Sequence, residues 1–200
     1  MPQDRRDLRR QLFAKAATQG GYFTAAQAKD VGYSYQAQAH HVQAANWVRV
    51  DRGLFRLAEW IPEQYDDLRR WTLWSQGQGV VSHESGLSVH GIGEFESRRV
   101  HFTVPPSFTK DDPALTLHRL SLDANDVVEQ KGFAITTSIR SIVDVAAGAP
   151  DEDQLARAIE EAVEKGLLTR RQLRARAEQV DPKAALYVER AIQRMESPSA

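Results

Sequence analysis

The chain has no cysteine in its 200 residues. This absence excludes disulfide bonds, thiolate catalysis and cysteine-ligated zinc, and it is compatible with a reducing compartment. Long apolar runs are absent as well, since no segment approaches the roughly eighteen residues that a membrane span requires. The opening residues, MPQDRRDLRR, are charged where a secretory signal peptide would be apolar. We therefore expect a cytoplasmic protein without membrane contact.

Recognisable catalytic motifs are also missing. No phosphate-binding loop, dinucleotide fingerprint or zincin motif occurs, and Ser85 lacks the flanking glycines of a nucleophile elbow. His83 and His90 are seven residues apart and could share a helix face. Two histidines without a third ligand at coordination spacing are nevertheless more typical of core or surface positions than of a metal site. The sequence therefore predicts no catalytic residue, no metal ligand and no cofactor.

The composition is that of a soluble globular protein with one large domain or two small ones, since 42% of the residues are hydrophobic and 26% are charged. The net charge of −1 conceals an uneven distribution. Residues 1–61 carry nine basic and five acidic side chains, a net charge of +4, whereas the other 139 residues carry 17 basic and 22 acidic side chains, a net charge of −5. A basic lobe joined to an acidic one fits a nucleic-acid-binding module with a second domain. A random scatter of surface charge is the alternative.

The basic lobe begins with three segments of helical character, at residues 4–18, 24–31 and 35–46. Thr24 and Ser34 are good N-cap residues for the second and third segments, and Gly32 breaks the chain between them. Two short helices joined by a few residues that include glycine predict a helix-turn-helix. In such a unit the second helix is presented to the major groove of DNA.

The next segment, WVRVDRGLFRL at residues 47–57, predicts a β-hairpin because Gly53 can adopt the positive φ of a tight turn. A hairpin in this position is the wing of a winged helix. Arg49, Arg52 and Arg56 can reach phosphates or a minor groove beside the helix, and such contacts make binding weaken with salt. The alternative is that the same unit makes only protein–protein contacts.

We expect the third helix to read bases with its exposed positions, although none of them is basic. Glutamine can bridge adenine, His40 can donate to guanine, and Ala39 can touch a thymine methyl group. His41 lies nearer the packed side and is predicted to be structural. Attraction to phosphates must then come from the first helix and the wing. The expected exposed positions are Tyr35, Gln36, Gln38, Ala39, His40 and Gln43.

The second lobe, residues 62–200, mixes helical and strand patterns. We predict a helix at 62–76 and a short helix capped by Ser82. Four strands follow, at 98–106, 114–122 and on either side of Lys131-Gly132, and then helices at 137–148, 151–166, 169–179 and 182–195. The predicted fold class is α+β, with an N-terminal winged helix-turn-helix in residues 1–61 and a mixed C-terminal domain that has a small sheet and a helical tail.

Five segments, in this order, resemble one family. They are GGYFTAAQAKDVGYS at 20–34, WVRVDRGLFRL at 47–57, VSHESGLSVHGIG at 81–93, VHFTVP at 100–105 and ITTSIRSIVDVAAG at 135–148. The series resembles the AbiEi antitoxins of bacterial type IV toxin-antitoxin systems, which are also transcriptional repressors. The resemblance implies a winged helix that binds inverted repeats of double-stranded operator DNA in its own promoter. It also implies a C-terminal domain that counteracts a cognate nucleotidyltransferase-like toxin.

Carried over by position, the resemblance places the DNA-binding face at Ser34 to Gln43 with Arg49, Arg52 and Arg56, and it implies no enzymatic activity. The chain departs from the family where the third helix is usually richer in arginine and has an aliphatic residue in place of Gln38. Some longer relatives continue into an endonuclease-like domain, but this sequence shows no acidic-lysine catalytic cluster.

Two other interpretations remain open. The first is a protein-interaction adaptor that neutralises a toxin by direct binding without specific DNA recognition. The second is an enzyme that acts on nucleic acid through a metal-dependent activity at His83 or His90.

Overall fold

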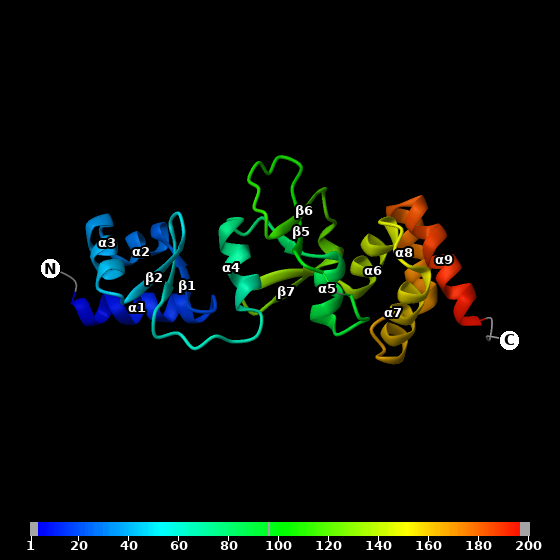
Figure 1. Cartoon of the computed structure of the whole chain (residues 1–200), viewed down its shortest axis with the longest axis horizontal. Coiled ribbons are helices and arrows are strands. Elements are labelled where there is room, and N and C mark those ends of the chain that lie inside the picture. The colour runs from blue at the N-terminus through cyan, green and yellow to red at the C-terminus, as the bar shows by residue number, and fades with distance from the viewer. Residues whose placement is uncertain (1–3, 96, 197–200) are drawn as a thin grey trace. The chain divides into compact units, whose positions relative to one another are not determined.

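A computed structural model describes residues 4–95 and 97–196, and these residues form an α+β fold, as predicted (Figure 1). Within the described ranges, no helix combines the length and the apolar character needed to cross a bilayer. The chain divides into two compact units. Unit 1 runs to Gln78 and includes Glu129–Phe133, and unit 2 comprises Gly79–Val128 and the chain from Ala134 onward. Unit 1 is thus longer than the expected 1–61 lobe, and a functional boundary at residue 61 stays a prediction.

Unit 1 begins with the predicted helix-turn-helix and wing. Its elements are α1 (Arg5–Ala17), β1 (Tyr22–Thr24), α2 (Ala25–Val31), α3 (Tyr35–Gln43), β2 (Trp47–Asp51), β3 (Leu54–Leu57) and α4 (Asp66–Trp74). The expected N-caps are confirmed, because the Thr24 hydroxyl accepts from the amide of Gln27 and the Ser34 hydroxyl accepts from the amide of Ala37. Gln27 returns its side chain to the amide of Thr24, which completes a capping box.

The wing is an antiparallel hairpin of β2 and β3 whose turn contains Gly53 at a φ of +71°, as predicted. β1 adds a third strand, so that the sheet has the order β1-β3-β2. This strand is not predicted from the sequence, because three residues are too few to show an alternating pattern. Phe23 of β1 packs edge-on against Trp47, with the two ring centroids 4.8 Å apart, and this contact joins the hairpin to the core beneath the helices.

The helix predicted at residues 62–76 is shorter in the structure, since α4 spans Asp66–Trp74. Asp66 is buried and accepts hydrogen bonds from the Trp60 indole at 3.2 Å and from the amide of Glu63 at 2.8 Å. These bonds hold the preceding residues in a loop. The helix therefore starts only after the loop is complete.

Unit 2 contains a five-stranded sheet in the order β6-β5-β4-β8-β7. Its elements are β4 (Val80–Val81), α5 (His83–His90), β5 (Val100–Val104), β6 (Leu115–Arg119), the 3₁₀ turn η1 (Ala124–Asp126), β7 (Val127–Gln130), β8 (Phe133–Thr136), α6 (Ser138–Ala147), α7 (Glu152–Glu164), α8 (Arg170–Val180) and α9 (Pro182–Glu196). The strands predicted around residues 98–136 and the helical tail are confirmed. The segment Glu129–Phe133, which comprises the end of β7, the turn and the first residue of β8, groups with unit 1.

The core of unit 2 is formed mainly by its helices. Ile142 of α6, Leu155 and Ile159 of α7, Leu173 of α8 and Ile192 of α9 are fully buried in one cluster. The apolar residues recur at helical spacing in each segment, so each helix turns one stripe into this cluster. The same core also fixes α5 and α6, two helices that carry polar groups described below.

Candidate nucleic-acid interface

The exposed side of α3 is a continuous stripe. Tyr35, Gln36, Ala39, His40 and Gln43 are all exposed, and at about 100° per residue they fall within less than half of the helix circumference. Ser34 is also exposed, and its hydroxyl caps the start of the helix. The predicted reading face is thus present as a surface, with one exception.

The exception is Gln38. The prediction that this residue is exposed is wrong. Gln38 retains only 3% of its accessible surface, and its side-chain amide donates to the carbonyl oxygens of Ala25 and Tyr33, each at 3.0 Å. Helical geometry puts residue 38 on the side opposite the exposed stripe, so the spacing alone could have revealed this. The aliphatic residue that the family resemblance implies at this place is also typical of a buried position. Gln38 therefore supports the turn between α2 and α3 and has no donor left for a base.

Two of the three predicted wing arginines are exposed, at Arg49 in β2 and Arg52 in the turn. Among the described residues neither guanidinium has an ion-pair partner. By contrast, Arg9 of α1 is held by both carboxylate oxygens of Glu59, at 3.0 and 3.1 Å. The wing therefore presents two cations whose charge no carboxylate of the described chain neutralises.

Arg56 is placed differently. It lies in the central strand β3 and is only partly exposed, and its guanidinium lies over the ring of Tyr22 at 5.8 Å. Its Nε atom is buried and has no hydrogen-bond partner among the described residues. The cation is therefore packed on an aromatic face, which limits its reach toward a phosphate.

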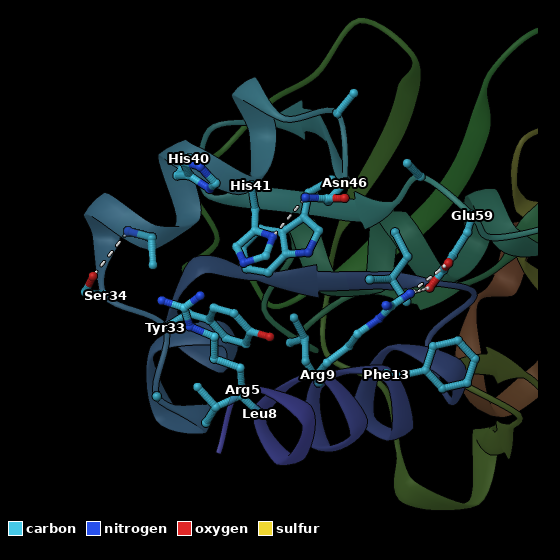
Figure 2. Close-up of a pocket in the computed structure, with 17 residues that line it drawn as sticks. Arg5, Leu8, Arg9, Phe13, Tyr33, Ser34, His40, His41, Asn46 and Glu59 are labelled. Atoms are coloured by element: carbon cyan, nitrogen blue, oxygen red, sulfur yellow. Dashed lines mark hydrogen bonds and ion pairs between the residues drawn. The ribbon is translucent and has the colours of Figure 1, made fainter. Parts of the chain in front are cut away.

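A groove of about 810 Å³ lies beside α3 in unit 1 (Figure 2). Aromatic rings form much of its wall: His41 stacks on Trp47 with centroids 4.6 Å apart, and Tyr33 meets Trp47 edge-on at 5.1 Å. Burial, followed by the charges of His40 and Arg9, lowers the pKa of His41. His41 is thus packed against Trp47, as predicted, and its lowered pKa favours the neutral imidazole.

Unit 2 brings together three histidines that are far apart in the sequence. His83 begins α5, His101 lies in β5 and His118 lies in β6, and one ring nitrogen from each lies within 4.8 Å of the others. The rings of His83 and His118 are stacked at 3.4 Å, and His101 Nδ1 is 3.1 Å from His118 Nε2. His90, the partner considered from the sequence, instead contacts the carbonyl oxygen of Thr136 at 2.8 Å.

The surroundings of the histidine cluster keep two of its rings neutral. Burial, reinforced by the other imidazoles, lowers the pKa of His83 to about 3 and that of His118 to about 4. Burial acts to raise the pKa of Glu84, the next residue of α5, but the His101 imidazole 2.8 Å away, the backbone amide of Glu84 and the charge of His83 outweigh it and lower the pKa to about 2. Near pH 7 the cluster therefore combines the neutral imidazoles of His83 and His118 with the ionised carboxylate of Glu84.

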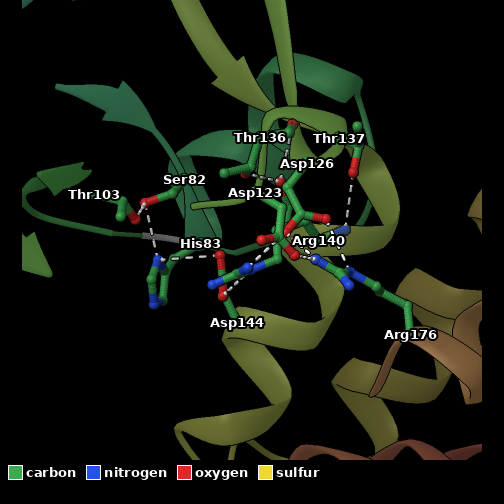
Figure 3. Close-up of polar contacts among 11 residues, drawn as sticks. Ser82, His83, Thr103, Asp123, Asp126, Thr136, Thr137, Arg140, Asp144 and Arg176 are labelled. Atoms are coloured by element: carbon green, nitrogen blue, oxygen red, sulfur yellow. Dashed lines mark hydrogen bonds and ion pairs between the residues drawn. The ribbon is translucent and has the colours of Figure 1, made fainter. Parts of the chain in front are cut away.

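Behind His83 lies a buried network of charges (Figure 3). Arg140 of α6 donates to Asp126 Oδ2 at 2.6 Å and to Asp144 Oδ1 at 2.7 Å. Arg176 of α8 donates to the other oxygen of Asp126 at 3.0 Å. The second oxygen of Asp144 is buried, has no hydrogen-bond partner among the described residues and lies 4.0 Å from His83 Nδ1. Burial raises the pKa of Asp144 to about 6.

No family model matches the chain, and no curated protein matches it either. A solved structure with a similar fold is the crystal structure of the RV2827C protein from Mycobacterium tuberculosis. The two share 13% sequence identity with a TM-score of 0.61, over 92% of this chain and 77% of that chain. At this identity the similarity shows the fold alone.

The sequence gives little indication that these three histidines form a cluster. His101 and His118 each sit in a strand of alternating pattern, where one histidine is unremarkable. Only the parallel pairing of β5 with β6, which sets Thr103 opposite His118, places His118 diagonally across from His101. Long-range pairing of this kind leaves no local signal in the sequence.

Proposed function

We propose that this protein is an antitoxin of the AbiEi type that binds operator DNA through its winged helix and represses its own operon. The observation that carries the proposal is the exposed stripe of α3 in the same compact unit as Arg49 and Arg52, two exposed cations of the wing. A polar helix face suits the major groove, and unneutralised cations beside it suit phosphates. The ordered resemblance to the AbiEi family supports the same function and a cytoplasmic location.

The proposed contacts divide by chemistry. The amide groups of Gln36 and Gln43 can pair with adenine, His40 can donate to guanine, and the methyl group of Ala39 can touch thymine. The capped start of α3 at Ser34 presents the positive end of a helix dipole to a phosphate. Two copies on an inverted repeat would place half-site centres about 34 Å apart or at a multiple of that distance.

The test is DNA binding by the full-length protein to the promoter upstream of its own gene, measured by fluorescence anisotropy at several salt concentrations. The double variant R49A/R52A should bind more weakly at moderate salt. The slope of log affinity against log salt should fall by about 1 for each phosphate that the variant can no longer bind. R157A, which removes an exposed cation from α7, is the matched control and should leave the slope unchanged. Unaltered binding by R49A/R52A would refute the wing assignment.

Arg56 provides a second comparison within the wing. Because its guanidinium packs on Tyr22, we expect R56A to change the salt slope by less than either exposed arginine does. An equal effect of all three variants would mean that Arg56 leaves the aromatic ring when DNA binds.

The antitoxin part of the proposal concerns residues 62–200 and the toxin encoded alongside. The full-length R49A/R52A protein should still rescue cells that express the nucleotidyltransferase-like toxin, because the variant leaves unit 2 intact. Loss of rescue together with loss of DNA binding would mean that neutralisation works through DNA, and it would overturn the division of labour between the two lobes.

The groove of unit 1 favours a second candidate function, that of an adaptor that binds the toxin directly. Aromatic walls flanked by the charged side chains of Arg5, Arg9 and Glu59 are typical of protein-binding surfaces (Figure 2). Co-purification of the toxin with the wild-type protein, abolished by Arg9→Ala in α1, would support the adaptor. Promoter binding that survives Arg9→Ala would separate the two functions.

A further inference from the structure

The histidine cluster of unit 2 draws its side chains from three elements that the fold holds firmly. His83 and Glu84 are the first two residues of α5, and His101 and His118 lie on the two parallel strands β5 and β6. The Ser85 hydroxyl accepts from the amide of His101 at 2.9 Å, which ties the start of α5 to β5. The relative positions of these side chains are thus set by backbone contacts as well as by packing.

Hydrogen bonds do not account for all the short contacts between polar atoms of the cluster. His101 Nδ1 lies 3.1 Å from His118 Nε2 and 2.8 Å from Glu84 Oε2. Oε2 is buried and has no hydrogen-bond partner among the described residues, so the short contact lacks hydrogen-bond geometry. A single proton on His101 Nδ1 can serve only one of its two neighbours. When His118 Nε2–H donates to His101 Nδ1 instead, the lone pair of Nδ1 faces the buried Glu84 oxygen, and a cation would relieve that repulsion.

The spacing fits one metal ion. Zinc binds imidazole nitrogen and carboxylate oxygen at about 2.0–2.2 Å in a tetrahedral arrangement, so neighbouring ligand atoms lie about 3.3 Å apart. The two contacts of His101 are close to that spacing, and one nitrogen from each histidine lies within 4.8 Å of the others. The rings of His83 and His118 are stacked at 3.4 Å with an interplanar angle of 12°, so metal binding requires one of them to rotate until both nitrogens face the same ion. The side chains of His83 and His101 are only 12% and 14% exposed, which favours an enclosed, structural site.

A second layer of contacts orients His83. Its Nδ1 lies 2.9 Å from the Ser82 hydroxyl, and that hydroxyl accepts from Thr103 Oγ1 at 2.8 Å (Figure 3). In the tautomer with its proton on Nδ1, His83 donates to Ser82 and Nε2 keeps its lone pair for a metal ion. Metal-binding histidines almost always engage the other ring nitrogen in this way. His83 also has a φ of +52°, an uncommon conformation for a residue other than glycine and one that tends to occur at functional sites. Ser82 thus orients a ligand, although the sequence predicts it as the cap of α5, where it makes no capping bond.

We propose that His83, His101 and His118 bind one divalent transition-metal ion, that the carboxylate of Glu84, which among these histidines contacts His101, moves in as the fourth ligand, and that Zn²⁺ is the ion best suited to this set. The ion clamps the start of α5 to strands β5 and β6. This function is separate from DNA recognition, because all four ligands belong to unit 2. Failure of the DNA-binding experiments would leave the metal site untouched.

The test is metal titration of the full-length protein, purified without a histidine tag and stripped with a chelator. Co²⁺ is the spectroscopic probe, and Zn²⁺ is measured by competition with a chromogenic chelator. We expect one Co²⁺ per chain with the strong visible absorption of four-coordinate cobalt, displaced by one equivalent of Zn²⁺. Zn²⁺ should also raise the thermal unfolding midpoint, since it binds the folded state.

Variants locate the site. H83N, H101N and H118N should each lower Zn²⁺ affinity by at least about 100-fold, and S82A by about 10-fold, because orienting contacts contribute less than ligands. H90N, on the same helix, and H40N, in unit 1, are matched controls that should bind as the wild type does. Circular dichroism of each metal-free variant checks folding.

Three results would overturn the proposal. The first is the absence of stoichiometric cobalt absorption in the wild-type protein, which decides the question even if every variant fails to fold. The second is binding that survives H118N. The third is binding lost equally in the H90N control, which would indicate adventitious surface coordination.

Discussion

Arg140 donates to Asp126 at 2.6 Å, and both side chains are almost fully buried, at 6% and 5% exposure. The pair joins α6 to the 3₁₀ turn that precedes β7. Arg176 of α8 donates a hydrogen bond to the same carboxylate. Asp126 also accepts from the amide of Thr137 through its backbone carbonyl, at 2.8 Å. Removing one partner of such a buried pair leaves an uncompensated charge.

We therefore predict that Arg140→Met lowers the free energy of unfolding by about 3–5 kcal/mol. The matched control is Arg174→Met, which breaks a pair with Glu189 of equally short distance, 2.7 Å, but with side chains 38% and 42% exposed. The control should cost less than about 1 kcal/mol, because water screens the exposed pair. Urea unfolding followed by circular dichroism measures both values. Equal costs would show that burial does not set the strength of these pairs.

A second prediction concerns the buried side-chain amide of Gln38. Gln38→Ala should cost about 1–3 kcal/mol, because the carbonyl oxygens of Ala25 and Tyr33 lose their donor. Gln38→Glu should cost more, since it turns a carboxylate toward two acceptors. Gln36→Ala, on the exposed side of α3, should change stability by less than about 0.5 kcal/mol. If Gln38→Ala weakened DNA binding without lowering the unfolding midpoint, a direct contact with DNA would have to be reconsidered.

Gly86 marks the closest approach of α5 to α6. A Cβ atom at this position would lie 2.5 Å from Ser141 Oγ, and that hydroxyl is buried and bonded to Thr136 Oγ1 at 2.7 Å. Gly86→Ala should therefore destabilise the protein by about 1–3 kcal/mol through overpacking, although alanine is the better helix former. Ser88→Ala on the exposed side of α5 is the control. The cost of Gly86→Ala should shrink in a Ser141→Ala background, and an unchanged cost would place the clash elsewhere.

Stability should depend on pH through the neutral imidazoles of the histidine cluster. The pKa of His83 falls from 6.5 to about 3 on folding, and that of His118 falls from 6.5 to about 4. Between about pH 6.5 and pH 4 the unfolded chain therefore binds protons on these two residues that the folded chain does not. Stability rises with pH in this window, and we expect the metal-free protein to lose about 2 kcal/mol between pH 7 and pH 5.

The groups that face the imidazoles act in both directions. Asp144, with its pKa raised to about 6, takes up a proton in the folded state first and opposes the loss, whereas Glu84, with its pKa lowered to about 2, adds to the loss only below about pH 4.5. Arg140 contributes a fixed positive charge. Urea unfolding at several pH values with chelator present should show a shallower dependence for H118N. A dependence as steep as that of the wild type would exclude His118 as a cause.

Local patterns in the sequence predicted most of the helices and strands, for reasons that involve few residues each. Thr24 and Ser34 cap their helices because a hydroxyl three residues before a free amide can satisfy it without any tertiary contact. Gly53 closes the wing because the turn needs a positive φ. Signals of this kind do not cover short elements such as β1, nor loops held by a buried side chain such as Asp66.

The exposed side of α3 and the charge of the wing were accessible from spacing and composition, because a helix sorts its residues by angle and a turn exposes its tip. The position of Gln38 follows from the same angular rule, although the predicted site included it. By contrast, the sequence could not reveal that Arg56 packs on Tyr22, that Asp126 joins two arginines, or that His83 meets His101 and His118. Those relationships depend on which strands pair and which helix crosses them. Such pairing is decided by the burial of the whole core, and no single stretch of the chain encodes it.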